Sequence, residues 1–381
     1  MNKGLYALAM GTFSLGITEF MMMGILSALA SDLNVSISTA GHLISAYALG
    51  VCVGAPLLLF ARRMPLRTIL LVLAAIIAIG NGLATFAPGF RTLMLARFIS
   101  GLPHGAFFGV GAIVARQLAA PGKMVSAVAF MIAGMTVATL AGVPLATFIT
   151  ENLTWRWAFG IVSLCGFITF ASVLLLVPHL KPLPDAGFKG QFAFLRTLPP
   201  WLIFGGVIFA QTGMYCWYSY IDPQMLNIAR FSPADLSWIM ILAGLGMFIG
   251  NIVAGRLSDH HAPSFVSLCV MACGIAVLLL FFLFCSNKLA AIVLMMAGTA
   301  VLFGSGSPLQ SSIVGYSRGG ELLGGACIQI AYNAGNAVAA WLGGHAIASG
   351  CGYGATSLFG IPFVAVGCIL ITVLYCRCER R

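Results

Sequence analysis

Charged residues are scarce in this sequence. Only 7% of its 381 residues are Asp, Glu, Lys or Arg, whereas 60% are hydrophobic. Soluble domains carry about 25% charged residues, so this chain has too few charges to cover the surface of a soluble globule. The composition therefore excludes a cytosolic enzyme, a nucleic-acid-binding protein and a disordered protein. It predicts an integral membrane protein, embedded in a lipid bilayer, that does not bind nucleic acid.

Metal-binding and redox motifs are missing as well. The 11 cysteines form no CxxC pair, and most of them lie within apolar runs. We interpret them as small apolar side chains. The sequence has no HExxH motif, and the glycine-rich stretch 304–308 lacks the lysine of a phosphate-binding loop. We therefore expect no metal, no cofactor and no enzyme activity.

Long apolar runs dominate the chain instead. A helix that crosses a bilayer needs about 20 mostly apolar residues. The first run is too long for the core of a signal peptide, which has about 7–15 residues, so we predict that it is retained. The runs are continuous and do not alternate, which favours helices over a β-barrel. Twelve candidate spans result: 5–30, 40–60, 68–87, 92–116, 124–148, 157–177, 200–221, 234–255, 263–285, 289–308, 322–345 and 355–376.

The distribution of basic residues predicts the orientation of these spans. With the N-terminus in the cytoplasm, 14 of the 19 Lys and Arg residues fall on the cytoplasmic side and four on the outer side, while Arg97 lies within a span. Cytoplasmic loops of membrane proteins are enriched in Lys and Arg. We therefore predict a multi-pass protein of the bacterial inner membrane with both termini in the cytoplasm.

A proline-rich segment after the sixth span divides the chain. We predict an N-terminal six-helix bundle over residues 1–180, a cytoplasmic linker over 181–199 and a C-terminal six-helix bundle over 200–381. Short matches relate the two halves: Gly50 and Gly54 recur as Gly246 and Gly250, and residues 133–134 recur as 334–335. The predicted fold is thus an all-α membrane protein of twelve helices in two pseudo-symmetric bundles. Parallel repeats of this kind place a substrate site between the halves, near the midplane.

Four segments carry the closest likeness to a known family: residues 18–33, 97–109, 134–144 and 155–159. They resemble the first-span, fourth-span and fifth-span motifs, and the following loop, of the major facilitator superfamily. The closest likeness is to its twelve-span drug:proton antiporter branch and to the sugar-efflux members similar to arabinose efflux permeases. In that family an acid and basic residues usually follow span two. The loop 61–67 lacks the acid, whereas Asp259 keeps it in the second half.

Three ionisable side chains are candidates for proton coupling. Glu19 is the one acid that this layout places deep in a span, where a charge costs about 2.5–3.5 kcal/mol. It is either a proton-binding site or a structural carboxyl group bonded to a neighbouring helix. The resemblance implies that Arg97 acts in proton coupling through the first span, and the alternative is an arginine that extends to the outer surface. His104 is either a proton relay or a neutral histidine bonded to a backbone carbonyl.

Polar and aromatic residues of spans seven and eleven are candidate cargo contacts. Amides and aromatic edges suit a neutral hydroxylated or amphipathic molecule, although the aromatic side chains could instead anchor the helix in lipid. The candidates are Gln211, Tyr215, Trp217, Tyr218, Asn333 and Asn336.

Small residues are candidates for conformational roles. The stripe that includes Gly101 and Gly105 allows close helix packing at an interface over which the two halves can move. Gly142 and Pro144 predict a bend in span five, and Asp259 is the candidate charge latch of the second half.

The leading functional hypothesis is an exporter that exchanges a small organic molecule, such as a drug or a sugar, for protons by alternating access. The proton gradient is its energy source, and we expect a monomer. One alternative is a facilitator or proton symporter that imports a sugar or nucleoside, because transport direction cannot be derived from sequence. A membrane protease or sensor is the other, but the chain offers neither a second buried acid nor a long soluble segment.

Overall fold

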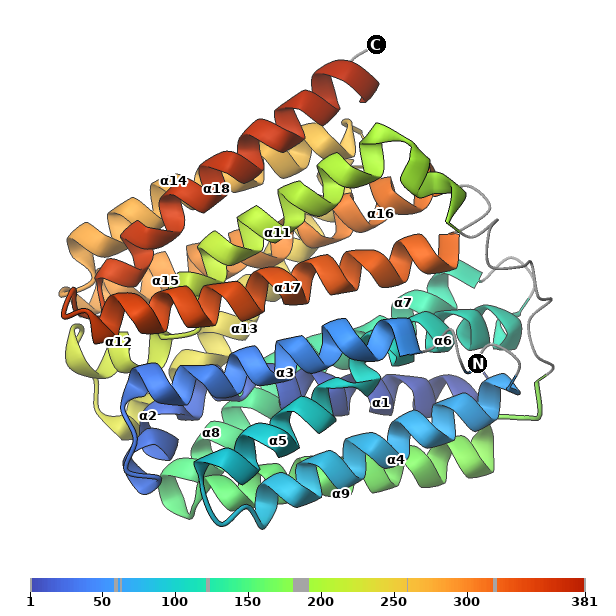
Figure 1. The fold of residues 1–381 in the computed structure, drawn as a ribbon, viewed down its shortest axis with the longest axis horizontal. Coiled ribbons are helices and arrows are strands. Elements are labelled where there is room, and N and C mark those ends of the chain that lie inside the picture. The colour runs from blue at the N-terminus through green and yellow to red at the C-terminus, as the bar shows by residue number, and fades with distance from the viewer. Residues whose placement is uncertain are drawn as a thin grey trace.

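The computed structural model describes residues 2–57, 61, 64–120, 124–180, 192–258, 260–317 and 321–379. Every regular element within these residues is a helix (Figure 1). The first half contains α1 (Gly4–Phe20), α2 (Met22–Asp32), α3 (Ile37–Leu57), α4 (Leu66–Thr85), α5 (Phe90–Gly101), α6 (Pro103–Leu118), α7 (Met124–Val137), the π-helix η1 (Ala138–Gly142), α8 (Val143–Asn152) and α9 (Trp155–Leu176).

The second half contains η2 (Ala193–Arg196), α11 (Leu198–Tyr218), α12 (Ile221–Asn227), η3 (Pro233–Asp235), α13 (Leu236–Ser258), α14 (Pro263–Phe284), α15 (Lys288–Gly304), α16 (Gly306–Tyr316), α17 (Glu321–Ala348), α18 (Ala355–Leu374) and η4 (Tyr375–Glu379). Part of the predicted linker, residues 181–191, lies outside the described residues. Its last part forms η2 and the first turn of α11. Prolines at the first positions of α11 suit a helix start, so this helix begins two residues earlier than predicted.

Several long helical rods are interrupted. Helices α1 and α2 meet at a 50° bend, α5 gives way to α6 just before Pro103, and η1 precedes Pro144. Proline lacks a backbone N–H and breaks regular helix hydrogen bonding, which accounts for the last two breaks. The bend that the sequence predicts at Gly142 is thus present as a π-helical turn.

Within the described residues, nine helical stretches are long and apolar enough to cross a membrane, and α1 with α2 supplies a tenth if the bent pair is one span. The rods of α11 and α17 do not meet the same apolarity threshold, although both exceed the required length. Both carry buried amides, including Gln211 and Asn333. The number of twelve spans therefore stays a prediction. The two helices that are not among the candidate spans, α11 and α17, carry the candidate cargo contacts.

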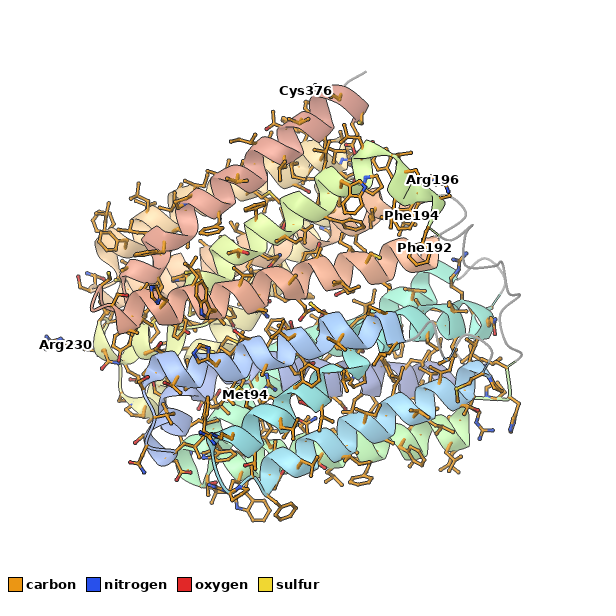
Figure 2. The ribbon with its side chains drawn as sticks, in the orientation of Figure 1. Met94, Phe192, Phe194, Arg196, Arg230 and Cys376 are labelled. Atoms are coloured by element: carbon orange, nitrogen blue, oxygen red, sulfur yellow. The ribbon has the colours of Figure 1, made fainter. Side chains whose placement is uncertain are left out.

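The helices of each half pack mainly with one another, and the same pairs recur in the second half. Helix α1 packs on α7 and α9, α3 on α5, and α4 on α9; correspondingly, α11 packs on α17 and α18, α13 on α15, and α14 on α18. The first half lies below the second in Figure 1, and both chain ends lie toward the right of the picture. Figure 2 places Arg230 at the opposite end of the bundle from Arg196 and Cys376.

Glycines show the repeat in atomic detail. A Cβ atom on Gly50 or Gly54 would meet the carbonyl groups of Phe98 or Leu102, because α3 and α5–α6 touch backbone to backbone. In the second half, a Cβ atom on Gly246 or Gly250 would meet the carbonyl groups of Met296 and Ala300. Small residues allow such close helix contacts. The short glycine matches in the sequence therefore mark equivalent contacts in space.

The two halves meet along three seams. Helix α3 packs on α17, η1 and α8 pack on α13, and α2 packs on α12. Hydroxyl groups bridge the first seam: Ser38 Oγ donates to the Gly344 carbonyl at 2.6 Å and Ser45 Oγ to the Ala337 carbonyl at 2.8 Å. The contact between the halves is therefore made by α2, α3, η1 and α8 of the first half and by α12, α13 and α17 of the second.

Candidate functional site

Glu19 lies at the end of α1, directly before the bend to α2, and its side chain is only 8% exposed. The nearest ionisable side chain is His104, whose Nε2 lies 3.7 Å from Glu19 Oε2. This distance exceeds the usual length of a hydrogen bond. The carboxyl group is therefore buried beside an imidazole without being tied to it.

His104 is held in place by two aromatic neighbours. Its Nδ1 lies 2.8 Å from the hydroxyl of Tyr47 on α3, and its ring stacks on Phe108 with centroids 5.2 Å apart. Because His104 follows Pro103 at the start of α6, the chain break directs its ring toward α1 and α3. The contact with Tyr47 leaves Nε2 as the nitrogen that faces Glu19. The predicted bond from His104 to a backbone carbonyl is replaced by this side-chain contact.

Arg97 on α5 is fully buried, so it does not extend to the outer surface. Its Nη1 donates to the Thr18 carbonyl at 2.6 Å and its Nε to the Leu43 carbonyl at 3.3 Å. The Thr18 carbonyl lies in the last turn of α1, where carbonyl groups lack helical donors. The guanidinium also lies 4.4 Å from the centroid of the Tyr47 ring, within the range of a cation–π contact. Arg97 thus fixes the helix end that carries Glu19.

Tyr47 joins these three groups, and it was missed by the sequence-based prediction. It touches His104 through its hydroxyl and Arg97 through its ring, and its side chain is 1% exposed. A buried tyrosine hydroxyl usually needs a hydrogen-bond partner, so a tyrosine inside an apolar run was the available signal. Glu19, Tyr47, Arg97 and His104 are hereafter called the coupling cluster.

No ion pair within 4.0 Å joins Arg97 to Glu19 in the described part of the chain. The link between them runs through the backbone of Thr18. The positive charge of Arg97 therefore acts on Glu19 over a longer distance than in an ion pair.

The second half supplies buried polar groups opposite this cluster. Tyr215 on α11 is buried, and its ring centroid lies 6.2 Å from that of Tyr218. On α17, Asn333 and Asn336 are buried, and the side-chain oxygen of each lacks a hydrogen-bond partner. Buried polar atoms normally have partners. These two oxygens are thus available to a bound molecule.

The other two candidate cargo contacts on α11 differ in their surroundings. Gln211 is buried where α11 passes Gly335 of α17. Trp217 packs within the core of the second half, with its ring 5.2 Å from that of Phe281 and against Gly298. The Trp217 ring thus lies in the core of the second half, while its indole Nε1 is buried without a hydrogen-bond partner. Its role as a cargo contact stays a prediction.

The candidate conformational residues occupy different seams. Gly101 packs on the Tyr47 carbonyl within the first half, whereas Gly105 lies near both Ala55 and Gln329 of the second half. Gly142 closes η1 against Ile17. Pro144 follows in the first turn of α8. Asp259 lies outside the described residues.

A second acid is buried, contrary to the prediction that Glu19 is the one deep carboxyl group. Asp222 is 0% exposed in α12. The sequence-based layout placed it in the outer loop after span seven, because the apolar run ends at residue 221. The chain instead makes a turn after Tyr218 and continues as α12 into the contact with α2.

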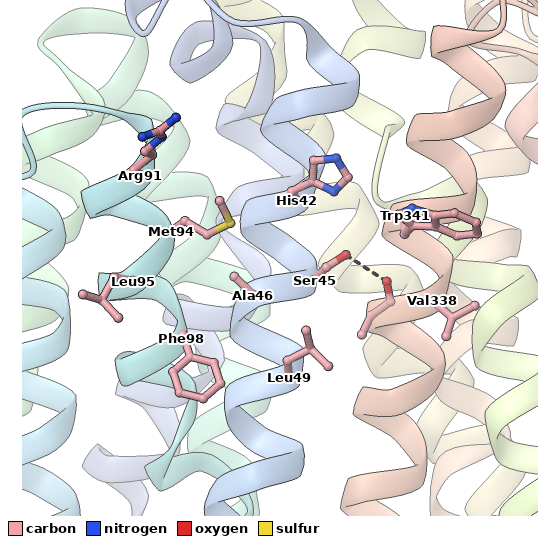
Figure 3. Close-up of a pocket in the computed structure, with 11 residues that line it drawn as sticks. His42, Ser45, Ala46, Leu49, Arg91, Met94, Leu95, Phe98, Val338 and Trp341 are labelled. Atoms are coloured by element: carbon pink, nitrogen blue, oxygen red, sulfur yellow. Dashed lines mark hydrogen bonds between the residues drawn. The ribbon is translucent and has the colours of Figure 1, made fainter.

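An open groove of about 800 Å³ lies between α3, α5 and α17 (Figure 3). Arg91 and His42 gather at one end of it, and apolar side chains such as Leu49, Leu95 and Trp341, each about half exposed, form its walls. It contains none of the coupling or cargo candidates. Among the described residues, no group of His, Cys, Asp and Glu side chains could hold a metal ion.

Residues 8–229 match the model of the Major Facilitator Superfamily. The chain belongs to this superfamily of transporters. AraJ of Escherichia coli (strain K12) is 41% identical, with 100% of this chain and 97% of AraJ covered. The inner membrane transport protein YdhP of the same strain is 34% identical, with 97% and 95% covered. These matches confirm the resemblance that the sequence motifs indicate, and the transporter family agrees with a function other than catalysis.

Two further comparisons give matches at lower sequence identity. A chloramphenicol resistance protein of Streptomyces lividans is 30% identical, with 91% of this chain and 90% of that protein covered. A solved bacterial homologue of the human lysosomal transporter Spinster, in an inward-facing and unoccupied conformation, superposes with a TM-score of 0.68. It covers 98% of this chain and 94% of that chain at 14% identity. This likeness in structure supports the all-helical fold alone.

Proposed function

We propose that this chain exports a small organic molecule across the bacterial inner membrane in exchange for protons. The observation that carries the proposal is the buried Glu19 carboxyl group at the junction of the two halves. Its Oε2 lies 3.7 Å from His104 Nε2, and the next residue, Phe20, packs on Phe303 of the opposite half with ring centroids 5.4 Å apart. Relatives named as an inner membrane transport protein and as a chloramphenicol resistance protein support export and this location.

Protonation of Glu19 would change the contact between the halves. As a carboxylate it is attracted by the buried charge of Arg97 and accepts hydrogen bonds from cargo or from the opposite half. As a neutral acid it no longer carries a charge through the hydrocarbon region. Tyr47 and Arg97 hold the surrounding groups in place, so a proton bound at one carboxyl group alters a contact that both halves share.

Cargo would bind between α11 and α17, opposite the coupling cluster. The unpaired oxygens of Asn333 and Asn336 accept hydrogen bonds, while Tyr215, Tyr218 and Gln211 add aromatic surface and further polar contacts. These groups suit a neutral molecule with hydroxyl or amide donors. A sugar and chloramphenicol are both of this kind.

The proposal includes twelve spans with both termini in the cytoplasm, and a monomer as the transporting unit. Both ends of the chain lie on one side of the bundle (Figure 1), which is the arrangement that an even number of spans requires. Rocking of the first half against the second would alternate the access of the site. Each proton that moves across 100 mV supplies about 2.3 kcal/mol, which corresponds to roughly fifty-fold accumulation of cargo.

Reconstitution with Glu19→Gln tests the proposal. In proteoliposomes with an acidic lumen, an antiporter accumulates labelled chloramphenicol or arabinose from outside, whereas a proton symporter requires an acidic exterior. We expect wild-type protein to accumulate one of these probes only with the acidic lumen, and Glu19→Gln to reach no more than equilibrium. Asp235→Asn, which changes an exposed helix-capping acid, is the matched control. Wild-type accumulation by Glu19→Gln would show that the coupling role is wrong.

A further inference from the structure

Asp222 is a buried acid that the coupling cluster does not use. It lies in the first turn of α12 in the second half, and its carboxyl Oδ2 accepts the backbone N–H of Ser27 on α2 at 2.7 Å. This hydrogen bond joins the two halves at the end of the bundle opposite the chain termini. It therefore exists only while α2 and α12 are in contact.

The surroundings of Asp222 supply no positive charge. No Lys, Arg or His nitrogen of the described residues lies within 4.0 Å of its carboxyl group. The charged group that acts on it is Glu151 on α8, which has the same sign. Asp32 on α2 is already paired with Arg156, and Tyr220 donates to the Ala340 carbonyl. A buried carboxylate with only a like charge nearby is strongly disfavoured.

Two unpaired atoms lie at the same contact. Asp222 Oδ1 and Ser27 Oγ are both buried without a hydrogen-bond partner, although the Ser27 hydroxyl faces the Asp222 carboxyl group. A carboxylate can only accept hydrogen bonds, whereas a protonated carboxyl group has one O–H donor. The Ser27 hydroxyl can donate to the ionised carboxylate and offsets part of the cost of burying the charge, whereas a proton on Oδ1 would remove that charge altogether.

We propose that Asp222 is a second proton-binding site, protonated while the outer ends of the halves touch and ionised when they separate. The inference rests on the proposed topology and on alternating access. Because the carboxyl group would be uncovered only toward the outside, its proton is taken from and returned to the same side. It adds no proton to the transport stoichiometry, and it makes closure of the outer end depend on external pH.

Accessibility of the outer seam tests this inference. Ser38 is half-buried against Gly344 when the seam is closed, so Ser38→Cys reports opening as a faster reaction with a membrane-impermeant maleimide. Cys351 is exposed and is replaced by serine as background. In right-side-out vesicles, we expect labelling of the Asp222-containing protein to become several-fold faster as external pH rises from about 5.5 to 8.5. In Asp222→Asn, labelling should stay slow and independent of pH.

Two further variants keep the outcome decisive. Ser27→Ala removes a hydroxyl that can donate to the ionised Asp222 carboxylate without removing the carboxyl group, so the midpoint of the labelling profile should move about one pH unit higher. An unchanged midpoint in Ser27→Ala, or a full pH response in Asp222→Asn, overturns the inference. The labelling of Asp222→Asn counts only if this variant elutes as folded protein. If it does not, the labelling of Ser27→Ala alone tests the inference.

Glu19→Gln separates this inference from the proposed function. We expect its labelling profile to keep the pH response while its gradient-driven accumulation is lost. If the pH response disappears in Glu19→Gln but persists in Asp222→Asn, the external proton acts at Glu19 and the inference is wrong. If Glu19→Gln accumulates cargo normally while Asp222→Asn loses the response, the proposed coupling role fails and the outer-seam site stands.

Discussion

In the first half, the close packing of α3 on α5–α6 brings Tyr47 against Arg97 and His104. The same packing of α13 on α15 brings together apolar side chains and the hydroxyl of Thr299. The glycine contacts give the equivalence: Gly50 corresponds to Gly246, and the Phe98 carbonyl to that of Met296. With these offsets, the positions of Tyr47, Arg97 and His104 correspond to Ala243, Met295 and Leu302, all of them buried.

The comparison separates packing from chemistry. Both halves need glycine where two helix backbones touch, and both have it at the same places. Only the first half has ionisable groups beside that contact, while the second half contributes amides and tyrosines from α11 and α17. A repeated scaffold can therefore assign proton handling to one half and cargo contacts to the other, so that each rocking movement changes the distance between the two functions.

The largest expected effect comes from placing an arginine in the second half at the position equivalent to Arg97. Met295→Arg places a guanidinium at the counterpart of Arg97, where the Tyr47 counterpart is alanine and offers no aromatic face. An arginine at the centre of a span costs about 2.5–3.5 kcal/mol even on insertion scales, and overpacking adds to this. We expect little folded protein after detergent extraction, measured by size-exclusion chromatography.

Met295→Leu is the matched control, because it preserves an apolar side chain of similar volume. It should elute and melt like the wild type. If Met295→Arg also did so, the apolar core of the second half would tolerate a charge, and the division of chemistry between the halves would not follow from packing.

A smaller effect is expected at the contact that both halves share. Gly50→Ala and Gly246→Ala each push a methyl group into a backbone carbonyl, and overpacking of this kind typically costs about 1–3 kcal/mol. We expect both variants to lower the melting temperature by similar amounts. Gly315→Ala is the control, because a Cβ atom there meets nothing within 4 Å. Tolerance in one half alone would show that the two contacts are not equivalent.

Hydropathy and residue type could predict much of this architecture. Apolar runs located most helices, and the proline-rich segment gave the predicted boundary between the halves. The cost of burying charge selected Glu19, and the family resemblance selected Arg97. These predictions depend on how far a residue lies from the ends of its apolar run, and this distance can be counted in a single sequence. The family matches confirm the resemblance, while the site roles stay predictions.

The direction in which a side chain points could not be predicted in the same way. Trp217 and Tyr215 lie on one helix at similar depth, yet the ring of Trp217 packs on Phe281 and that of Tyr215 lies against Tyr218. Rotation about the helix axis depends on the neighbours, which hydropathy does not identify. Asp222 was misplaced for a related reason: the turn after Tyr218 returns the chain to the bundle, and no apolar run marks a seven-residue helix.

The smallest expected effect tests how the cluster of the first half is held together. Tyr47→Phe removes the hydroxyl that lies 2.8 Å from His104 Nδ1 but keeps the ring beside Arg97. Loss of one neutral hydrogen bond typically costs about 1 kcal/mol. We therefore expect gradient-driven accumulation to slow by about five-fold, with cargo exchange at equal pH nearly unchanged. The exposed Tyr6 provides the control Tyr6→Phe. Equal slowing of both kinds of transport would mean that Tyr47 supports the cargo path, and the separation of functions between the halves would be lost.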